Sequence, residues 1–273
     1  MNKILVATDF SACASNAMEY AMELARVTGL EIAAIHAIGS FEGIFNNTYN
    51  ALYIEEYYNS KREALKKWAA TFAEREAFRA VPVSTTCEVG SVSGVITKYI
   101  ESNPVDLLVM GTMGSTGIAG LFGSNASTMV EKTKTPTLII PLESKFSPDP
   151  VITLATDFST GLSAGDVTAL RELVRAFGTT RVNVVNVVED PAWKTNSAGE
   201  EKLRKLVPGT ELDFQYIKED STTDGIVHFV AASGTDILCL VKKHHGVVYR
   251  IFNTSTVNRV MGKSIKAILV MHE

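Results

Sequence analysis

The sequence predicts an α/β protein made of two tandem, doubly wound domains, each with a five-stranded parallel sheet. One observation is that short aliphatic runs alternate with longer segments of helical period, as βαβ units require. The other is that the residues ATDFS occur at 7–11 and again at 155–159, each time directly after an aliphatic run. The same order of elements follows both. We therefore predict an internal duplication, with a first copy at 1–142 and a second copy at 148–273.

In the first copy the predicted strands are nearly continuous apolar runs, which indicates a sheet covered on both faces. These strands lie at 3–9, 31–38, 81–89, 105–111 and 135–141. The first helix is predicted over 11–30, with Ser11 as its N-cap and Gly29 at its end. A longer helix is predicted around 52–78 and another over 92–100.

The second copy repeats this order. Its predicted strands lie at 150–157, 181–190, 211–219, 235–243 and 266–273, with a first helix running through Val167 and Phe177. Its second helical segment is reduced to 198–209, so this copy has lost surface at that edge. The polar, proline-containing stretch 142–150 is predicted to be a short linker.

Composition limits the classes of function. The chain has 273 residues, of which 46% are hydrophobic and 21% charged, with a net charge of −4, as in soluble globular proteins. Without a basic stripe we expect no nucleic acid partner, and with only short apolar runs we expect no membrane span. With no signal peptide pattern, a cytoplasmic location is expected. The three cysteines form no CxxC, which favours small apolar fillers over a disulfide or zinc site.

Asp9 and Asp157 follow the first strand of each copy, where ligands bind in open parallel sheets. A carboxylate there can accept hydrogen bonds from ribose hydroxyls or a base amine. It can equally cap the helix that follows, and for an isolated TDFS motif capping is the favoured interpretation.

The stretch 109–130 is more informative, because it carries glycines between a buried strand and an amphipathic helix. They are Gly111, Gly114, Gly117, Gly120 and Gly123. Bare backbone lets N–H groups approach an anion, and Ser124 and Asn125 at the helix start would add donors. A phosphate cradle is favoured over a simple flexible loop. It is neither a P-loop nor a dinucleotide fingerprint, since it follows the fourth strand and lacks GK[ST].

These residues resemble the universal stress protein family in its tandem form, and the resemblance covers both copies. It rests on Asp9 in ATDFS, HAI at 36–38, GTMG at 111–114 with GSNAS at 123–127, and TPTLIIP at 135–141. The family's nucleotide-binding pattern is Gly, two residues, Gly, nine residues, Gly and then Ser, Thr or Asn. Here eight residues, 115–122, replace the nine. The implied fold is Rossmann-like, of the adenine nucleotide α-hydrolase kind.

The resemblance implies ATP, or AMP or ADP, in the first copy, with Mg²⁺. Asp9 would meet the ribose and the backbone near Ala37 the adenine. Gly111 would let the nucleotide pass the strand end, and Gly114 would admit the phosphates. Gly123, Ser124 and Asn125 would donate to the phosphates. Ala7, which replaces the proline common in the family, completes the implied set with Thr8 and Met110.

The second copy is predicted to be degenerate. An ungapped alignment of the fourth-strand loops sets Lys242 against Gly111, His245 against Gly114 and Thr254 against Gly123, with the same spacing in both copies. Large side chains would then stand where bare backbone is needed. His244 and His245 are interpreted as part of a solvated loop, because adjacent histidines point apart and lack a third ligand nearby.

The leading hypothesis is therefore a stress-response protein that binds one adenine nucleotide and acts as a regulatory or interaction module. Catalytic residues are not evident, and slow ATP hydrolysis or self-phosphorylation on Ser115, Thr116 or Ser124 is the weaker alternative. A nucleotide-independent scaffold is another alternative. An amidating or hydrolytic enzyme of the wider superfamily would need an SGGxDS-type loop where this chain has ATDFSACAS. The copies are expected to pair through their fifth strands as an intramolecular pseudo-dimer, and a homodimer of chains stays possible.

Overall fold

The structure is a computed structural model that describes residues 1–39, 51–112, 123–158, 162–188, 196–242 and 254–272. The first copy contains β1 (Lys3–Ala7), α1 (Ala12–Thr28), β2 (Glu31–Ile38), α2 (Ala51–Ala73), β3 (Val83–Val89), α3 (Val92–Ser102), β4 (Leu107–Gly111), α4 (Ser124–Lys132) and β5 (Thr137–Ile140). A short 3-10 helix, Glu76–Phe78, takes the end of the segment predicted as one long helix.

The second copy contains β6 (Ile152–Ala155), α5 (Thr168–Phe177), β7 (Arg181–Val188), α6 (Ser197–Leu206), β8 (Glu211–Lys218), α7 (Thr222–Ala232), β9 (Ile237–Lys242), α8 (Thr254–Lys263) and β10 (Ala267–His272). The predicted α/β class and doubly wound strand arrangement are confirmed. Two features differ between copies: α6 is much shorter than α2, and α5 begins late, well after the ATDFS motif.

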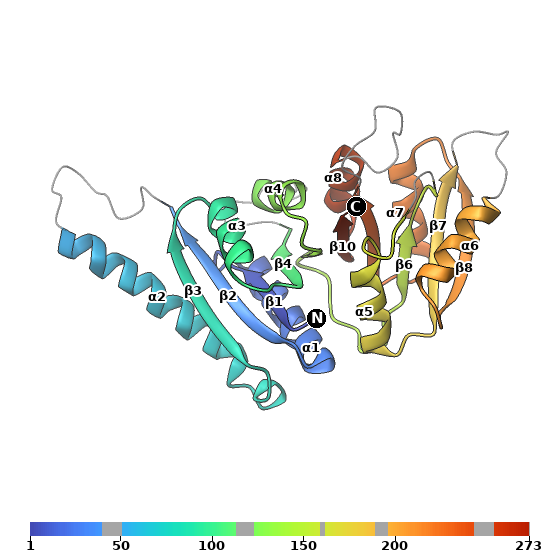
Figure 1. The fold of residues 1–273 in the computed structure, drawn as a ribbon. Helices are drawn as coiled ribbons and strands as arrows, with labels where there is room; N and C mark the ends of the chain where they lie inside the picture. The colour runs from blue at the N-terminus through green and yellow to red at the C-terminus, as the bar shows by residue number, and fades with distance from the viewer. Residues whose placement is uncertain (40–50, 113–122, 159–161, 189–195, 243–253, 273) are drawn as a thin grey trace.

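One continuous sheet joins the two copies. Figure 1 shows the first copy, coloured blue to green, beside the second copy, coloured yellow to red. The strand order is β3-β2-β1-β4-β5-β10-β9-β6-β7-β8. Neighbouring strands within each copy are parallel, whereas β5 and β10 pair antiparallel, with Leu138 opposite Leu269 and Thr137 opposite Val270. The carboxyl end of β10 therefore meets the amino end of β5.

Apolar side chains form one cluster on each face of this sheet, and both clusters contain residues of both copies. On one face α1 and α5 lie over the sheet with α2 and α6, and on the other α3 and α4 lie with α7 and α8. Cys13 and Cys239 are buried, in keeping with apolar fillers, whereas Cys87 is only half-buried; burial raises the pKa of the Cys239 thiol. The hydrophobic core is thus continuous across the copies.

The segment between the copies is anchored rather than loose. The Phe146 ring lies 5.4 Å from the Tyr20 ring of α1 and 5.8 Å from the Phe177 ring of α5. The Asn16 amide donates to the carbonyl oxygens of Pro141 and Ser144, both at 2.9 Å. The predicted linker therefore packs between one helix of each copy.

Local sequence signals explain the ends of α1. Ser11 Oγ accepts the Ala14 N–H at 3.1 Å, so the predicted N-cap is confirmed. Gly29 has φ +74° and donates its N–H to Ala25 O, a left-handed helix end that glycine adopts without a steric penalty. Within the described ranges, the longest helices are too short or too polar to span a bilayer.

Candidate functional site

The candidate site lies at the carboxyl ends of the central strands of the first copy. The strand β1 lies between β2 and β4, with Ala7 opposite Ile35 and Val6 opposite Val109. This is the point where the chain's winding direction reverses, the usual place for a ligand in an open α/β sheet. The ends of β1, β2 and β4 therefore bring together residues that are far apart in the sequence.

The turn after β1 presents Asp9 at the surface. Its Oδ1 accepts the Ser11 N–H at 3.0 Å, so the carboxylate shapes the turn that leads into α1. Phe10 adopts a left-handed conformation with φ 65°, and Phe158 in the second ATDFS motif has φ 53°. The Asp9 carboxylate thus stabilises the turn, whereas the cap of α1 is the Ser11 hydroxyl, so the choice between capping and ligand binding for Asp9 stays a prediction.

His36 ties this turn to β2. Its Nδ1–H donates to Thr8 O at 2.8 Å, and the Phe10 ring lies 4.5 Å from its imidazole. The ring is 8% exposed, and Nε2 has no hydrogen-bond partner in the part of the chain that the structure describes. In the second copy Asn186 makes the equivalent bond to Thr156 O at 2.7 Å. The two copies therefore fix the same turn with different side chains.

The end of β4 is built around Gly111. A Cβ added there would lie 2.8 Å from Cys13 Sγ and 3.1 Å from the Cys13 carbonyl carbon, so the glycine lets the start of α1 pack on this strand end. The Gly123 N–H donates to Thr112 O at 2.7 Å. The start of α4 is thereby held beside the end of β4.

The amino end of α4 has no side-chain cap in the described structure. Gly123 is its N-cap, and the first helical N–H bond to this residue comes from Ser127 at 3.1 Å. Ser124 and Asn125 are exposed. Uncapped N–H groups at a helix start carry partial positive charge and suit an anion.

Most of the implied set thus gathers at one sheet edge. Three of these residues are nearly buried there: Ala7, Thr8 and Met110. They would contact a ligand through backbone atoms and the small exposed part of their side chains. Ala37 is half-buried near the end of β2, beside the β1 turn. Gly114 lies outside the described residues, as do His244 and His245 in the second copy.

The strand pairing corrects the ungapped alignment of the two fourth-strand loops. Ile4 and Ile152 are equivalent, because each lies three residues before its ATDFS motif. Ile4 pairs with Leu107, whereas Ile152 pairs with Ile237. The matching residues of β4 and β9 are therefore Leu107 and Ile237. The ungapped alignment had instead matched Leu107 with Leu238, one residue farther along β9.

It follows that Gly111 matches Val241, and Thr112 matches Lys242. Farther on, the buried face of α4 (Ala126, Met129, Val130) matches that of α8 (Val257, Val260, Met261). The second copy therefore has one more residue between strand and helix, and the expected equal spacing was wrong. The ungapped alignment could not reveal this slip, because the aliphatic run of β9 simply continues through Val241.

The second copy still lacks bare backbone at this strand end. Val241 is 4% exposed and occupies the position of Gly111. Its side chain is compatible with a helix α5 that begins only at Thr168. The residue that matches Cys13 in the second copy, 161, lies outside the described residues.

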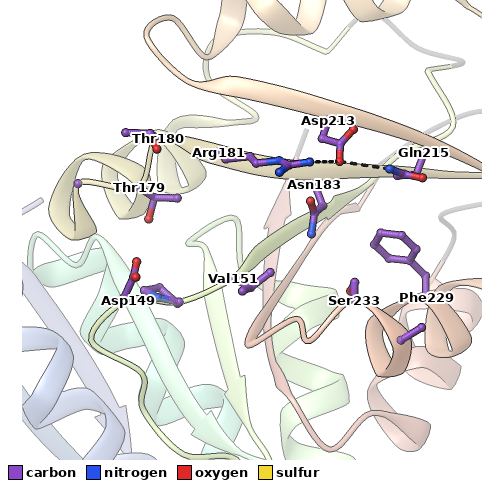
Figure 2. Close-up of a pocket in the computed structure, with 13 residues that line it drawn as sticks. Asp149, Val151, Thr179, Thr180, Arg181, Asn183, Asp213, Gln215, Phe229 and Ser233 are labelled. Atoms are coloured by element: carbon purple, nitrogen blue, oxygen red, sulfur yellow. Dashed lines mark hydrogen bonds and ion pairs between the residues drawn. The ribbon is translucent and has the colours of Figure 1, made fainter.

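A separate hollow of about 620 Å³ lies at the amino ends of β7 and β8, between these strands and the end of α7 (Figure 2). Arg181 donates to Asp213 Oδ2 at 2.6 Å, and the Gln215 amide donates to the same oxygen at 3.2 Å. These bonds, that from Arg181 foremost, lower the pKa of the Asp213 carboxyl. The polar groups on this wall thus largely satisfy one another.

Sequence reasoning missed this hollow. The sequence feature that could have indicated it is the presence of polar residues inside two strands. Asn183 and Asp213 form a cross-strand pair, and the equivalent pair in the first copy is Ala33 and Ser84. Lys242 lies in a strand, as predicted, but its burial was not anticipated from the sequence.

Comparisons with known proteins agree with this geometry. The sequence profile of the universal stress protein family matches residues 1–141. A universal stress protein of Methanocaldococcus jannaschii is 30% identical over 141 residues, covering 50% of this chain and 81% of the relative.

Two solved structures are similar in fold over both copies. A universal stress protein from Archaeoglobus fulgidus has a TM-score of 0.75 at 18% identity, covering 99% of this chain and 98% of that chain. A Pseudomonas aeruginosa protein described as a candidate member of the same family has a TM-score of 0.62 at 13% identity, covering 100% and 93%. Together with the profile match and the M. jannaschii relative, the fold and strand-end geometry lead to one conclusion: the chain belongs to the universal stress protein family.

Proposed function

We propose that this universal stress protein binds one adenine nucleotide per chain, ATP or else AMP or ADP, at the strand edge of the first copy. Binding would serve a regulatory or interaction role in the stress response. The observation that carries the proposal is the uncapped start of α4, held beside the end of β4 by the 2.7 Å bond from Gly123 N–H to Thr112 O. Phosphate oxygens are the natural partners of such N–H groups.

Each implied residue has a proposed role. The exposed Asp9 carboxylate would accept hydrogen bonds from ribose hydroxyls, and the β2 backbone near Ala37 would meet the adenine edge. Backbone N–H groups at Gly123, Ser124 and Asn125 would donate to the phosphates, and Gly114, which lies outside the described residues, would admit them. The described chain holds no cluster of three metal-ligating side chains, so Mg²⁺ would be bound mainly through phosphate and water oxygens.

The two copies are proposed to act as an intramolecular pseudo-dimer of domains 1–142 and 148–273, with one site. The β5–β10 pairing and shared core support this arrangement. The proposed stoichiometry is one nucleotide because Val241 and Lys242 replace Gly111 and Thr112 in the second copy.

The test is calorimetric titration of the purified chain with ATP and Mg²⁺, preceded by mass analysis of any nucleotide that co-purifies. Asp9→Ala should weaken binding, whereas its matched control Asp157→Ala should leave it unchanged. A stoichiometry of two nucleotides would contradict the single-site proposal.

A nucleotide-independent scaffold is the second candidate, and one observation favours it. The packing of Cys13 against Gly111 already accounts for a glycine at that position without any ligand. If wild-type protein binds no nucleotide at millimolar ATP, the scaffold is the better description.

A further inference from the structure

Lys242 is a buried lysine that crosses from the second copy to the first. It is the last residue of β9 and is 4% exposed. Its Nζ donates to Val130 O at 3.0 Å and to Glu131 O at 3.2 Å, both in the last turn of α4. Burial lowers the pKa of this amine, and the nearby Glu131 acts in the opposite direction.

These two bonds complete the carboxyl end of α4. The helix runs from Ser124 to Lys132, and the Thr133 N–H donates a hydrogen bond to the Met129 carbonyl oxygen. Lys242 Nζ donates to the next two carbonyl oxygens, those of Val130 and Glu131, which have no partner within the helix. A cation there also stabilises the helix dipole, an effect that is larger for partly buried geometries.

At this matched pair of positions, only the residue of the second copy contacts a helix of the other copy. The residue of the first copy that matches Lys242 is Thr112. The Thr112 side chain is short, and its hydroxyl lies 3.7 Å from Cys13 Sγ within its own copy. In the described chain, the second copy therefore supports α4, while the matching position of the first copy offers no such support to α8.

The place where Lys242 holds α4 is well defined. In β9–β10 Lys242 is opposite His272, and in β10–β5 Val270 is opposite Thr137, so the end of β9 lies near the amino end of β5. The opposite end of α4 is the proposed phosphate end. Because the buried side of α4 is packed in the core, a shift at its last turn is transmitted along the helix.

We propose that Lys242 is a positioning residue for the nucleotide phosphates: the second copy, which has no site of its own, holds α4 in the place that the phosphates require. This inference rests on the proposed function. By thermodynamic linkage, nucleotide binding then strengthens the contact between the copies.

The experiment compares wild type with Lys242→Met, which keeps the aliphatic length and removes the donors and charge. Each protein is titrated by calorimetry with ATP plus Mg²⁺ and, separately, with adenosine. ATP affinity should fall about fivefold or more, in the usual range for coupled sites, and adenosine affinity should stay the same. The matched control is Lys218→Met, at the exposed end of β8, which should change neither affinity.

The outcomes separate the two proposals. Absence of ATP binding in wild type overturns the proposed function itself. If wild type binds ATP, then unchanged ATP affinity in Lys242→Met, or an equal loss for ATP and adenosine, overturns the positioning role alone.

Hydrogen exchange on wild-type protein gives a second measurement that needs no variant. Saturating ATP should slow exchange in the last turn of α4 and at the ends of β9 and β10, and leave β7 and β8 unchanged. Unchanged exchange at the ends of β9 and β10 would overturn the coupling.

Discussion

Single residues show that the repeated ATDFS motif is chiefly a structural device. Phe10 and Phe158 both adopt left-handed backbone conformations that are uncommon for a bulky side chain. Each ring is held by aromatic neighbours: His36 and Trp68 surround Phe10, while Phe158 packs on Phe214 and Tyr216. The identical residues adopt a similar backbone as far as Phe10 and Phe158, whereas the aromatic neighbours differ between the copies.

Gly111→Ala tests the packing role of the glycine. The new Cβ would lie 2.8 Å from Cys13 Sγ and close to Cys13 backbone, so α1 or β4 must shift. We expect the free energy of unfolding to fall by about 1–3 kcal/mol, measured by urea denaturation. Gly165→Ala is the control, since its Cβ would meet Ser163 Oγ at an ordinary 3.5 Å. Equal stability of the two variants would contradict this account.

Tyr216 provides a prediction for alkaline pH. Burial, and then the 2.5 Å hydrogen bond that its hydroxyl donates to Glu200, raise the pKa of Tyr216 to about 12. A raised pKa means that the folded state favours the neutral phenol. Its contribution to stability is complete below the ordinary pKa of about 10 and is lost as the pH rises through about 12.

The measurement is urea unfolding of wild type and Tyr216→Phe at pH 9 and at pH 11.5. Wild type should be the more stable protein at pH 9, and its advantage should shrink at the higher pH. A stability advantage of wild type that grows with pH would contradict a raised pKa of Tyr216 in the folded state.

At the scale of elements, the strands were predictable because both faces of each are covered, which leaves continuous aliphatic runs. The ends of α1 followed from Ser11 and Gly29, whose chemistry is local. The register of β9 against β4 was not predictable, since Val241 and Lys242 follow the same run and only backbone pairing tells which one takes the place of Gly111.

The helix α4 offers a test in which helix stability and ligand affinity should move in opposite directions. Gly123 has φ −62° and ψ 133°, which any residue can adopt, and makes no side-chain cap. Gly123→Asp would cap α4 and add a few tenths of a kcal/mol of stability. The new carboxylate would also accept hydrogen bonds from the N–H groups that are proposed to bind phosphate, and its negative charge would repel the phosphate.

We expect Gly123→Asp to weaken ATP binding about tenfold or more, by charge repulsion and loss of donors, in calorimetric titration. Gly123→Asn is the matched variant, because it caps the helix without the charge and should weaken ATP binding less. If Gly123→Asp binds ATP as tightly as wild type, the phosphates do not bind at the start of α4.

For the whole molecule, the sheet and both apolar clusters cross from one copy to the other. Pairing of the fifth strands could be anticipated from their apolar sequences. The anchoring of Phe146 and the hollow beside Asn183 could not, because each depends on surfaces that meet only after the copies fold. Of the candidate site, Asp9, the glycine-rich stretch and the donors at the start of α4 were predicted from the sequence, whereas the lack of a described side-chain cap and the bond from Gly123 N–H to Thr112 O required the structure.

This continuity predicts that the chain unfolds as one unit. Leu138 is fully buried and lies opposite Leu269 at the junction. Leu138→Ala should reduce the free energy of unfolding by about 2–5 kcal/mol. Scanning calorimetry should show one transition for both proteins, shifted to lower temperature in the variant. Two separate transitions, with only one shifted, would mean that the copies fold independently.

The antiparallel pairing of β5 with β10 also has a consequence for behaviour at low protein concentration. Two separate chains that met through these strands would dissociate on dilution, as mass action requires. Here both strands belong to one chain, so the local concentration of each for the other is fixed by the connecting segment. Lys242 thus stays within reach of α4 however scarce the protein is in the cell.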